Sequence, residues 1–208
     1  MFLVFLVSLL VSFILIGVYY TLLLRRANGK KLPDTTFFKL HTLFSELVDP
    51  KHCTERKLEE FISLLEQVAR KTTSLSRFQV FDQFKTNTEG NNLFLHFCSK
   101  GEYKKLRALL SSSIGAKDIL LKSRNHHSLT ALHFACHSGN IDLVKILCQA
   151  ASKMKVEEEF FSLKTHEEFN ALHLACATGR NQVVDFLLEQ SEMEDRKEEK
   201  DKSGNNCL

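Results

Sequence analysis

The sequence predicts an all-α protein: a solenoid of stacked helical repeats, preceded by a helical adaptor and one N-terminal transmembrane helix. Three observations favour this fold class. The first 24 of the 208 residues carry no charged side chain. Apolar residues then recur at helical spacing between residues 37 and 84. A sequence motif that begins near residue 128 recurs 40 residues later. Self-similarity at a fixed period is typical of repeat proteins.

The composition limits the classes of function. Apolar residues make up 44% and charged residues 25% of the chain, which is an ordinary globular balance and excludes disorder throughout. The 28 basic and 25 acidic residues give a net charge of +3, and no basic stripe is interleaved with aromatic residues. We therefore expect no nucleic-acid partner.

Residues 1–24 are predicted to form the transmembrane helix. A helix of this length would span about 36 Å, enough to cross about 30 Å of hydrocarbon. Tyr19 and Tyr20 lie near one end, where aromatic rings favour the lipid–water boundary. A cleaved signal peptide is the alternative, but the segment lacks a basic start and a small-residue cleavage site, and its apolar core is too long. The membrane is thus an expected partner through residues 1–24.

The basic residues of the juxtamembrane linker, residues 25–33, predict the orientation. Arg25, Arg26, Lys30 and Lys31 follow the apolar segment directly. The positive-inside rule then places the repeats in the cytoplasm of a single-pass membrane protein. The same four cations could instead bind anionic headgroups, at about 1 kcal/mol each.

Residues 34–87 are predicted to form a helical adaptor that caps the N-terminal face of the stack. A separate partner-binding helical module is the alternative. Thr54 is a plausible N-cap, with Glu55 in the first turn of the helix that follows. Three apolar stripes at helical spacing predict three helices: Phe37, Leu40, Phe44 and Leu47; Leu58, Phe61, Leu64, Leu65 and Val68; and Phe78, Phe81 and Phe84.

The repeated segment predicts a helix–turn–helix unit. Leu132, Ala135 and Cys136 share one face of a short helix, and Gly139 is suited to end it. One such unit cannot bury its own apolar face, so units must stack. The second helix carries an apolar face of its own, made by Leu143, Val144, Leu147 and Cys148. Six residues of the motif recur in the second copy: Ala131 and Ala171, Leu132 and Leu172, His133 and His173, Ala135 and Ala175, Cys136 and Cys176, and Gly139 and Gly179.

These motifs resemble the ankyrin repeat, with Ala131 and Ala171 in place of the family's proline. The resemblance covers residues 88–208 and implies repeats at about 88–124, 125–164 and 165–200, with a partial fourth at 201–208. The first copy is atypical, because Leu95 occupies the histidine position. The resemblance implies that His133 and His173 tie adjacent repeats together by hydrogen bonds. The structural repeat residues are Leu132, His133, Ala135, Gly139, Leu172, His173, Ala175 and Gly179.

The spacings of 36–40 residues exceed the usual ankyrin period of about 33. We expect enlarged, solvated inter-repeat loops at 153–159 and 189–202, with docking loops as the alternative. The incomplete fourth repeat favours a truncated sequence of a longer array. The alternative is a short protein whose C-terminal face docks on a partner.

No chemistry of catalysis or metal binding is expected. Cys98, Cys136 and Cys176 occupy the same position in successive repeats. The resemblance implies that neighbouring repeats stack about 10 Å apart, which is too far for a disulfide or a shared zinc ion. His133 and His137 could hold a metal at i, i+4 spacing, but the resemblance gives His133 a structural role. No catalytic constellation and no phosphate-binding glycine pattern is present. We expect no enzyme activity, cofactor, metal or small-molecule substrate.

The resemblance implies protein binding through loop tips and the concave surface of the first helices. We therefore expect a membrane-anchored scaffold that recruits a protein partner. The alternatives are the N-terminal part of a longer ankyrin-containing channel or enzyme, and a secreted effector with an unusual signal peptide. The candidate face consists of Arg124, Asn125, His126, His127, Phe134, His137, Ser138, Thr165, His166, Glu167, Glu168, Leu174, Ala177 and Thr178, with His96, Ser99 and Lys100 added by the first repeat.

Overall fold

The computed structural model describes residues 34–207, apart from residues 72–75, 87, 113 and 195. This part of the chain contains helices and no strand, only an isolated antiparallel bridge between Lys85 and Asn92. The predicted all-α class and the stack of helical repeats are confirmed.

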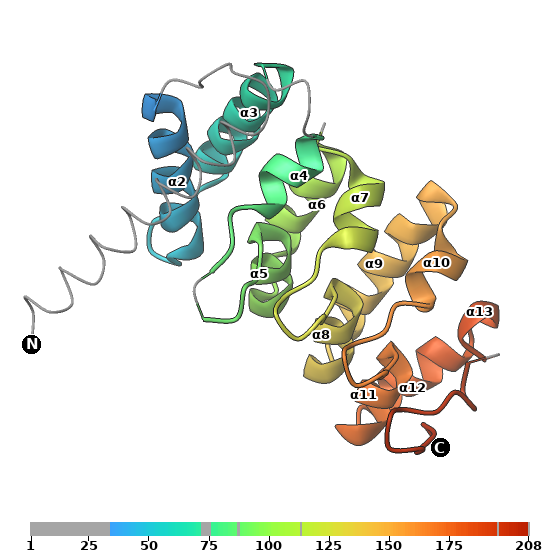
Figure 1. The fold of residues 1–208 in the computed structure, drawn as a ribbon. Coiled ribbons are helices and arrows are strands. Elements are labelled where there is room, and N and C mark those ends of the chain that lie inside the picture. Colours follow the sequence, from blue (N-terminus) through green and yellow to red (C-terminus); the bar gives the residue numbers. More distant parts are fainter. Residues whose placement is uncertain (1–33, 72–75, 87, 113, 195, 208) are drawn as a thin grey trace, which may run out of the picture.

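Three successive units share the same order of three helices (Figure 1). The first helices, α5, α8 and α11, pack against one another in sequence, and each also packs on the second helix of its own unit. Among the third helices, α10 contacts both α7 and α13. The bounds are α5 Leu93–Lys100, α6 Tyr103–Ser111 and α7 Ala116–Lys122; α8 Ala131–Ser138, α9 Ile141–Met154 and α10 Glu157–Phe161; α11 Ala171–Ala177, α12 Asn181–Leu188 and α13 Ser191–Glu194.

A further group of three helices covers the N-terminal end of the stack. Helices α2 (Asp34–Val48), α3 (Glu55–Lys71) and α4 (Arg77–Asp82) follow one another as in a repeat. Helix α2 packs on α3 and on α5, and α3 packs on α4 (Figure 1). Thr54 precedes α3, and its hydroxyl accepts a hydrogen bond from the Lys57 amide at 3.4 Å. The adaptor segment is therefore built like one more repeat.

One continuous hydrophobic core runs through all the units. It extends from Leu40 in α2 to Cys207 beyond α13. Ala135 and Ala175 are fully buried in the layer of first helices. Small side chains at these positions let neighbouring first helices approach closely.

The expected solvated loops are instead partly helical. Residues 157–161 form α10, in which Phe160 and Phe161 are buried. Residues 191–194 form α13, and Met193 is fully buried. The physical reason is that a few apolar residues in these charge-rich segments bury themselves against the neighbouring unit. The extra length of the period is thus a third helix in each unit.

The predicted membrane localisation needs correction. Among the described residues, none of the helices is long and apolar enough to cross a bilayer. The longest of them, α3, has 17 residues and would reach about 25 Å, with charged side chains along one side. This finding contradicts the prediction of a single-pass membrane protein with cytoplasmic repeats. The predicted anchor, residues 1–24, and the linker with Arg25, Arg26, Lys30 and Lys31 lie outside the described residues.

Candidate protein-binding surface

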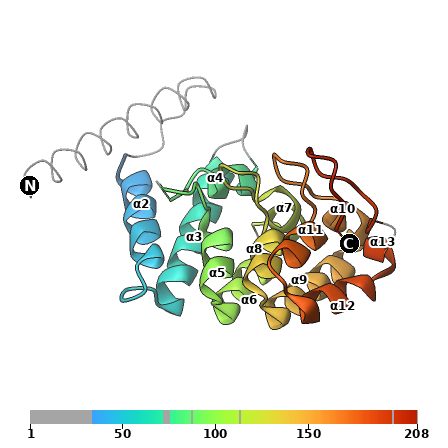
Figure 2. The same cartoon turned by 90° about the horizontal axis from the view of Figure 1, so that it is seen from below.

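Four hairpin turns form one edge of the stack, and we call this the tip edge. The turns precede α5, α8 and α11 and follow α13, and they lie on the same side of the helices (Figure 2). Each is closed by a matching backbone hydrogen bond: Thr86 N to Asn91 O (2.8 Å), Asn125 N to Leu129 O (3.2 Å), Thr165 N to Phe169 O (3.0 Å) and Asp201 N to Asn205 O (2.9 Å).

Neighbouring tips are also joined to each other by backbone hydrogen bonds. His126 N donates to Glu89 O at 3.1 Å, and Lys202 N donates to Glu167 O at 3.2 Å. Between them, His166 N lies 3.5 Å from His127 O. These backbone bonds fix the tips relative to one another. Side chains add to the joint between the second and third tips, where the Ser128 hydroxyl lies 3.2 Å from His166 Nε2.

The predicted tip residues divide into two groups. Two of them hold the hairpin: the Asn125 side-chain oxygen accepts from His127 N and Leu129 N, both at 2.9 Å, and the Arg124 guanidinium donates to Lys164 O at 3.0 Å. Burial lowers the pKa of Arg124. Thr165 is half-buried, and its hydroxyl accepts from Phe169 N. The others are exposed: His126, His127, His166, Glu167 and Glu168.

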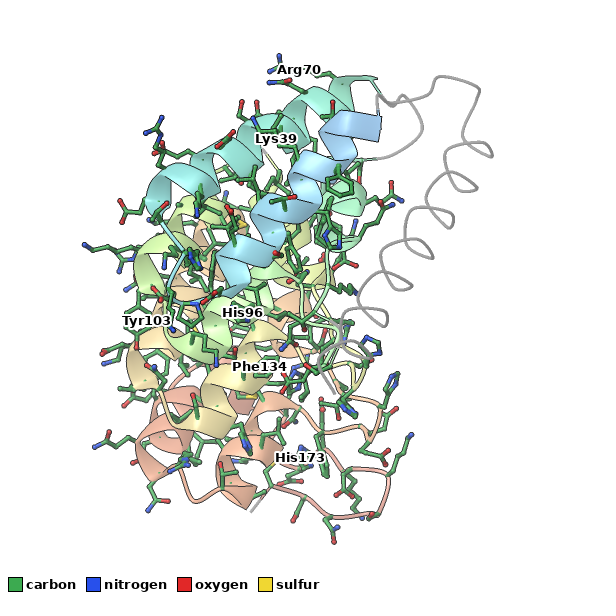
Figure 3. The ribbon with its side chains drawn as sticks, turned by 90° about the vertical axis from the view of Figure 1, so that its left-hand side faces the viewer. Lys39, Arg70, His96, Tyr103, Phe134 and His173 are labelled. Carbon is green, nitrogen blue, oxygen red and sulfur yellow. The ribbon has the colours of Figure 1, made fainter. Side chains whose placement is uncertain are left out.

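The first helices add an apolar strip beside the tips. Phe134 on α8 and Leu174 on α11 occupy equivalent positions, and both are half-buried. The hydroxyls of Ser138 and Thr178 donate to carbonyls of their own helices, Ala135 O at 3.0 Å and Leu174 O at 2.7 Å. Figure 3 looks onto this layer and labels His96, Phe134 and His173 on successive helices. His137 and Ala177 are exposed.

The equivalent surface of the first unit is partly covered. Helix α2 packs against α5, and His96 there is half-buried and hydrogen-bonded to the backbone of Val48. Burial is the main cause that lowers the pKa of His96, and Lys100 adds to it. Ser99 and Lys100 stay exposed. We therefore define the recognition face as the exposed and half-buried side chains of the second and third units: His126, His127, Phe134, His137, Ser138, His166, Glu167, Glu168, Leu174, Ala177 and Thr178.

The two motif histidines link neighbouring units from inside the stack. His133 Nε2 lies 3.1 Å from Phe169 O, and its Nδ1 lies 2.8 Å from the Thr130 hydroxyl. His173 Nε2 lies 3.3 Å from Asn205 O. Burial lowers the pKa of His133 to about 4, so the ring is neutral at physiological pH.

The remaining motif residues either are buried between the helices or end a first helix. Leu132, Ala135, Leu172 and Ala175 are all buried. Gly139 ends α8 with φ 74°, and Gly179 adopts φ 65° after α11. These positive angles are ones that L-residues adopt at a cost.

The cysteines are free thiols, and most of them are buried. All six are unpaired with one another, and Cys98, Cys136, Cys148 and Cys207 are buried. Burial raises the pKa of Cys148 to about 12 and that of Cys207 to about 11. Among the described residues, no group of three metal-ligating side chains comes together.

The first and last tips also belong to this surface, although the motif residues of the repeat did not predict them. Glu89 and Lys202 are exposed and continue the tip edge in both directions. Glycine at positions 90 and 204 is the sequence signal for these two hairpins. Both residues have positive φ, as Ser128 and Glu168 do at the same place in the two middle hairpins.

The fold and this surface define a helical-repeat binding scaffold. Residues 65–158 match a family model for ankyrin repeats in three copies, and residues 167–197 match a model for one ankyrin repeat. These ranges together span more than half of the chain, which belongs to the ankyrin-repeat family. Membership supports protein binding as the class of function.

No curated protein matches the chain significantly. Among solved structures, a chain of the crystal structure of the yeast ribosomal protein Rps3 in complex with its chaperone Yar1 is similar. It shares 17% sequence identity and covers 77% of this chain and 95% of its own, with a TM-score of 0.45. At this level of likeness, nothing about the yeast complex transfers to this protein.

Proposed function

We propose that this protein is a scaffold that binds a protein partner through the recognition face. The observation that carries the proposal is the hydrogen bonding between successive hairpin tips, which orders a row of exposed side chains before any partner arrives. Surfaces that are ordered in advance lose less conformational entropy on binding. The proposal assigns binding to this face and no catalytic step.

The chemistry of the recognition face suits a protein surface. Phe134 and Leu174 offer half-buried apolar side chains, and exposed His137 lies one helical turn beyond Phe134. Interfaces of this kind combine an apolar centre with a polar rim. At the third tip, Glu167 and Glu168 add two exposed carboxylates. Charges on a rim act mainly on the rate of association and on the choice of partner.

Site-specific photocrosslinking tests the proposal. A benzophenone side chain is introduced at exposed His137 or Ala177 in the full chain and irradiated in cells that naturally express the protein. Matched controls carry the same side chain at Lys117 near the start of α7 or Ser191 on α13, which are exposed and belong to third helices rather than to the recognition face. We expect one protein adduct shared by the two face positions and absent from the two controls.

A second variant ties the adduct to the apolar strip. Exchange of Phe134 and Leu174 for Glu should abolish the shared adduct. The thermal unfolding midpoint of this variant should fall, since Phe134 packs partly against the core, but it should stay above the temperature of the crosslinking experiment. Equal crosslinking from all four positions, or none from the face positions, would contradict the proposal.

A further inference from the structure

The second helices differ in length, and this difference creates a groove on the layer opposite the recognition face. Helix α9 has 14 residues, whereas α6 before it has nine. The last turns of α9 therefore extend past the end of α6. A groove of about 370 Å³ lies between the two helices, lined by Arg107 and Leu110 of α6 and by Ile146, Ala150, Lys153 and Met154 of α9. We call it the α6–α9 groove.

The groove has an apolar floor and basic sides. Leu110, Ile146 and Met154 are half-buried and pack against the core, and Ala150 is buried. Arg107 and Lys153 are exposed. No acidic side chain lines the groove. The uncharged side chains of Ser111 and Gln149 complete the lining.

The two cations lack carboxylate partners within the described part of the chain. Neither Arg107 nor Lys153 makes an ion pair there, whereas Lys117 and Lys122 on neighbouring α7 pair with Glu159 and Asp118 at 3.7 Å and 2.7 Å. Lys153 lies in the last turn of α9, where a positive charge interacts favourably with the helix dipole. The helix dipole does not account for the unpaired charge of Arg107, because Arg107 lies in the middle of α6.

We propose that the α6–α9 groove binds an acidic amphipathic helix of a second protein partner. Ile146, Ala150, Lys153 and Met154 follow one another at helical spacing along about 12 Å of α9. An amphipathic helix laid along such a strip places apolar residues at every third or fourth position into the groove. Carboxylates beside that apolar face would reach Arg107 and Lys153. The groove and the recognition face lie on different helix layers, so both can be occupied at once.

The groove on the other side of α9 is not suited to an acidic partner. It is lined by side chains of both signs, Lys145 with Glu157 and Glu192. Lys145 there is also engaged with the ring of Phe186, with Nζ 5.7 Å from the ring centre. The charge pattern thus selects the α6–α9 groove for an acidic partner.

The test uses a fluorescein-labelled synthetic peptide of about 18 residues, with Leu at every third or fourth position and Glu on both flanks. Binding to the full chain is followed by fluorescence anisotropy. The double variant R107E/K153E should bind about tenfold more weakly or worse, as expected for loss of close charge pairs. The control K51E/K200E makes the same change in net charge at exposed positions outside the groove and the recognition face, and it should bind like the parent. A peptide with Lys in place of Glu should bind about tenfold more weakly.

Amide shift mapping by NMR locates the peptide independently of the variants. Shifts confined to α6 and α9 support the proposal. The proposal is overturned if the parent gives no saturable binding, if both double variants lose binding equally, or if the shifts fall on α8 and α11. The last result would assign the peptide to the recognition face and leave the proposed function intact.

Discussion

His133 joins two units through a ring that water does not reach. Its Nδ1 lies against Thr130 at the start of α8, and its Nε2–H donates to Phe169 O in the next hairpin. Burial lowers its pKa to about 4, because a charged ring would lose its hydration. The link between these units therefore depends on a neutral imidazole.

This dependence predicts that the protein loses stability as the pH falls. The unfolded chain takes up a proton on this histidine near pH 6.5, whereas the folded chain does so only near pH 4. Between these values the free energy of unfolding should fall by about 1.4 kcal/mol per pH unit for this one group. His41 and His96, whose pKa values burial also lowers, act in the same direction.

Urea unfolding at pH 7.5, 6 and 5 measures the effect. The variant His133→Gln should show a shallower loss of stability with falling pH than the parent. Exchange of Ser138, an exposed residue of the same helix that does not titrate, for Gln should leave the slope unchanged. An identical slope in His133→Gln would show that the ring does not control the acid response.

Glu168 occupies a backbone conformation that favours glycine, with φ 63°. Gly90 and Gly204 hold the same place in the first and last hairpins. The exchange Glu168→Gly should raise stability by about 0.5 kcal/mol, since relief of the left-handed conformation outweighs the entropy of glycine. The side chain has only a long contact to Lys164 to lose, at 3.9 Å.

Thermal unfolding of two neighbouring variants checks this prediction. In Glu167→Gly the backbone gains no such relief, so the unfolding midpoint should fall slightly. A lower midpoint in both variants would mean that the hairpin carries no strain at Glu168.

At the scale of elements, the third helices account for the long repeat period. Helices α7, α10 and α13 follow the second helix of their units, and α10 contacts the other two. In α10 the adjacent rings of Phe160 and Phe161 pack together with centroids 5.5 Å apart. The third helix is therefore part of the packed unit and contributes to the joint between units.

Helix α10 should be essential for stability despite its five residues. The exchange Phe160→Ala should cost about 3–5 kcal/mol, the usual range for emptying a fully buried phenylalanine site. Exposed Glu158 in the same helix offers the control, and Glu158→Ala should change the free energy of unfolding by less than about 0.5 kcal/mol. Urea unfolding with far-ultraviolet circular dichroism measures the free energy of unfolding of both variants. Equal stability of the two variants would show that α10 is not essential for stability.

The sequence predicted the elements that carry long apolar periodicity. Leu58, Phe61, Leu65 and Val68 keep helical spacing over several turns, and all are buried in α3. Helices α10 and α13 escaped prediction because each has one turn and only one or two apolar residues among charged neighbours. Such short helices owe their stability to tertiary packing, which periodicity within the sequence does not show.

The sequence predicted where the candidate surface lies in the repeats, but it did not predict which of its side chains are exposed. Repeat register alone located Phe134 and Leu174 on equivalent turns of α8 and α11. It gave no sign that Asn125 turns inward to cap its own hairpin, or that α2 packs over His96. The α6–α9 groove was missed too, because it arises from a difference in length between two helices 30 or more residues apart.

At the scale of the whole molecule, one core spans all units, so its thiols should report on global unfolding. Cys98 and Cys136 are buried, and burial raises their pKa well above the ordinary thiol value. In native buffer both should be alkylated by iodoacetamide at least about 100-fold more slowly than in urea. Half-buried Cys53 and Cys176 should react before them. Mass spectrometry of timed samples measures each site, and fast native labelling of Cys136 would show that the stack opens locally at its centre.

The backbone bonds between hairpin tips also decide how the molecule would bear tension. Among the described residues, these backbone bonds join each tip to the next one along the stack, so a pull applied between the first and last units would load the joints between units in series, together with the helix packing at each joint. The weakest joint then sets the rupture force, however strong the others are. The widest of them is the one between His166 N and His127 O, at 3.5 Å. The same joint also carries the hydrogen bonds from Arg124 to Lys164 O and from His133 to Phe169 O. Stretching single molecules of the variant Arg124→Ala should therefore divide the stack between its second and third units at a lower force than in the parent.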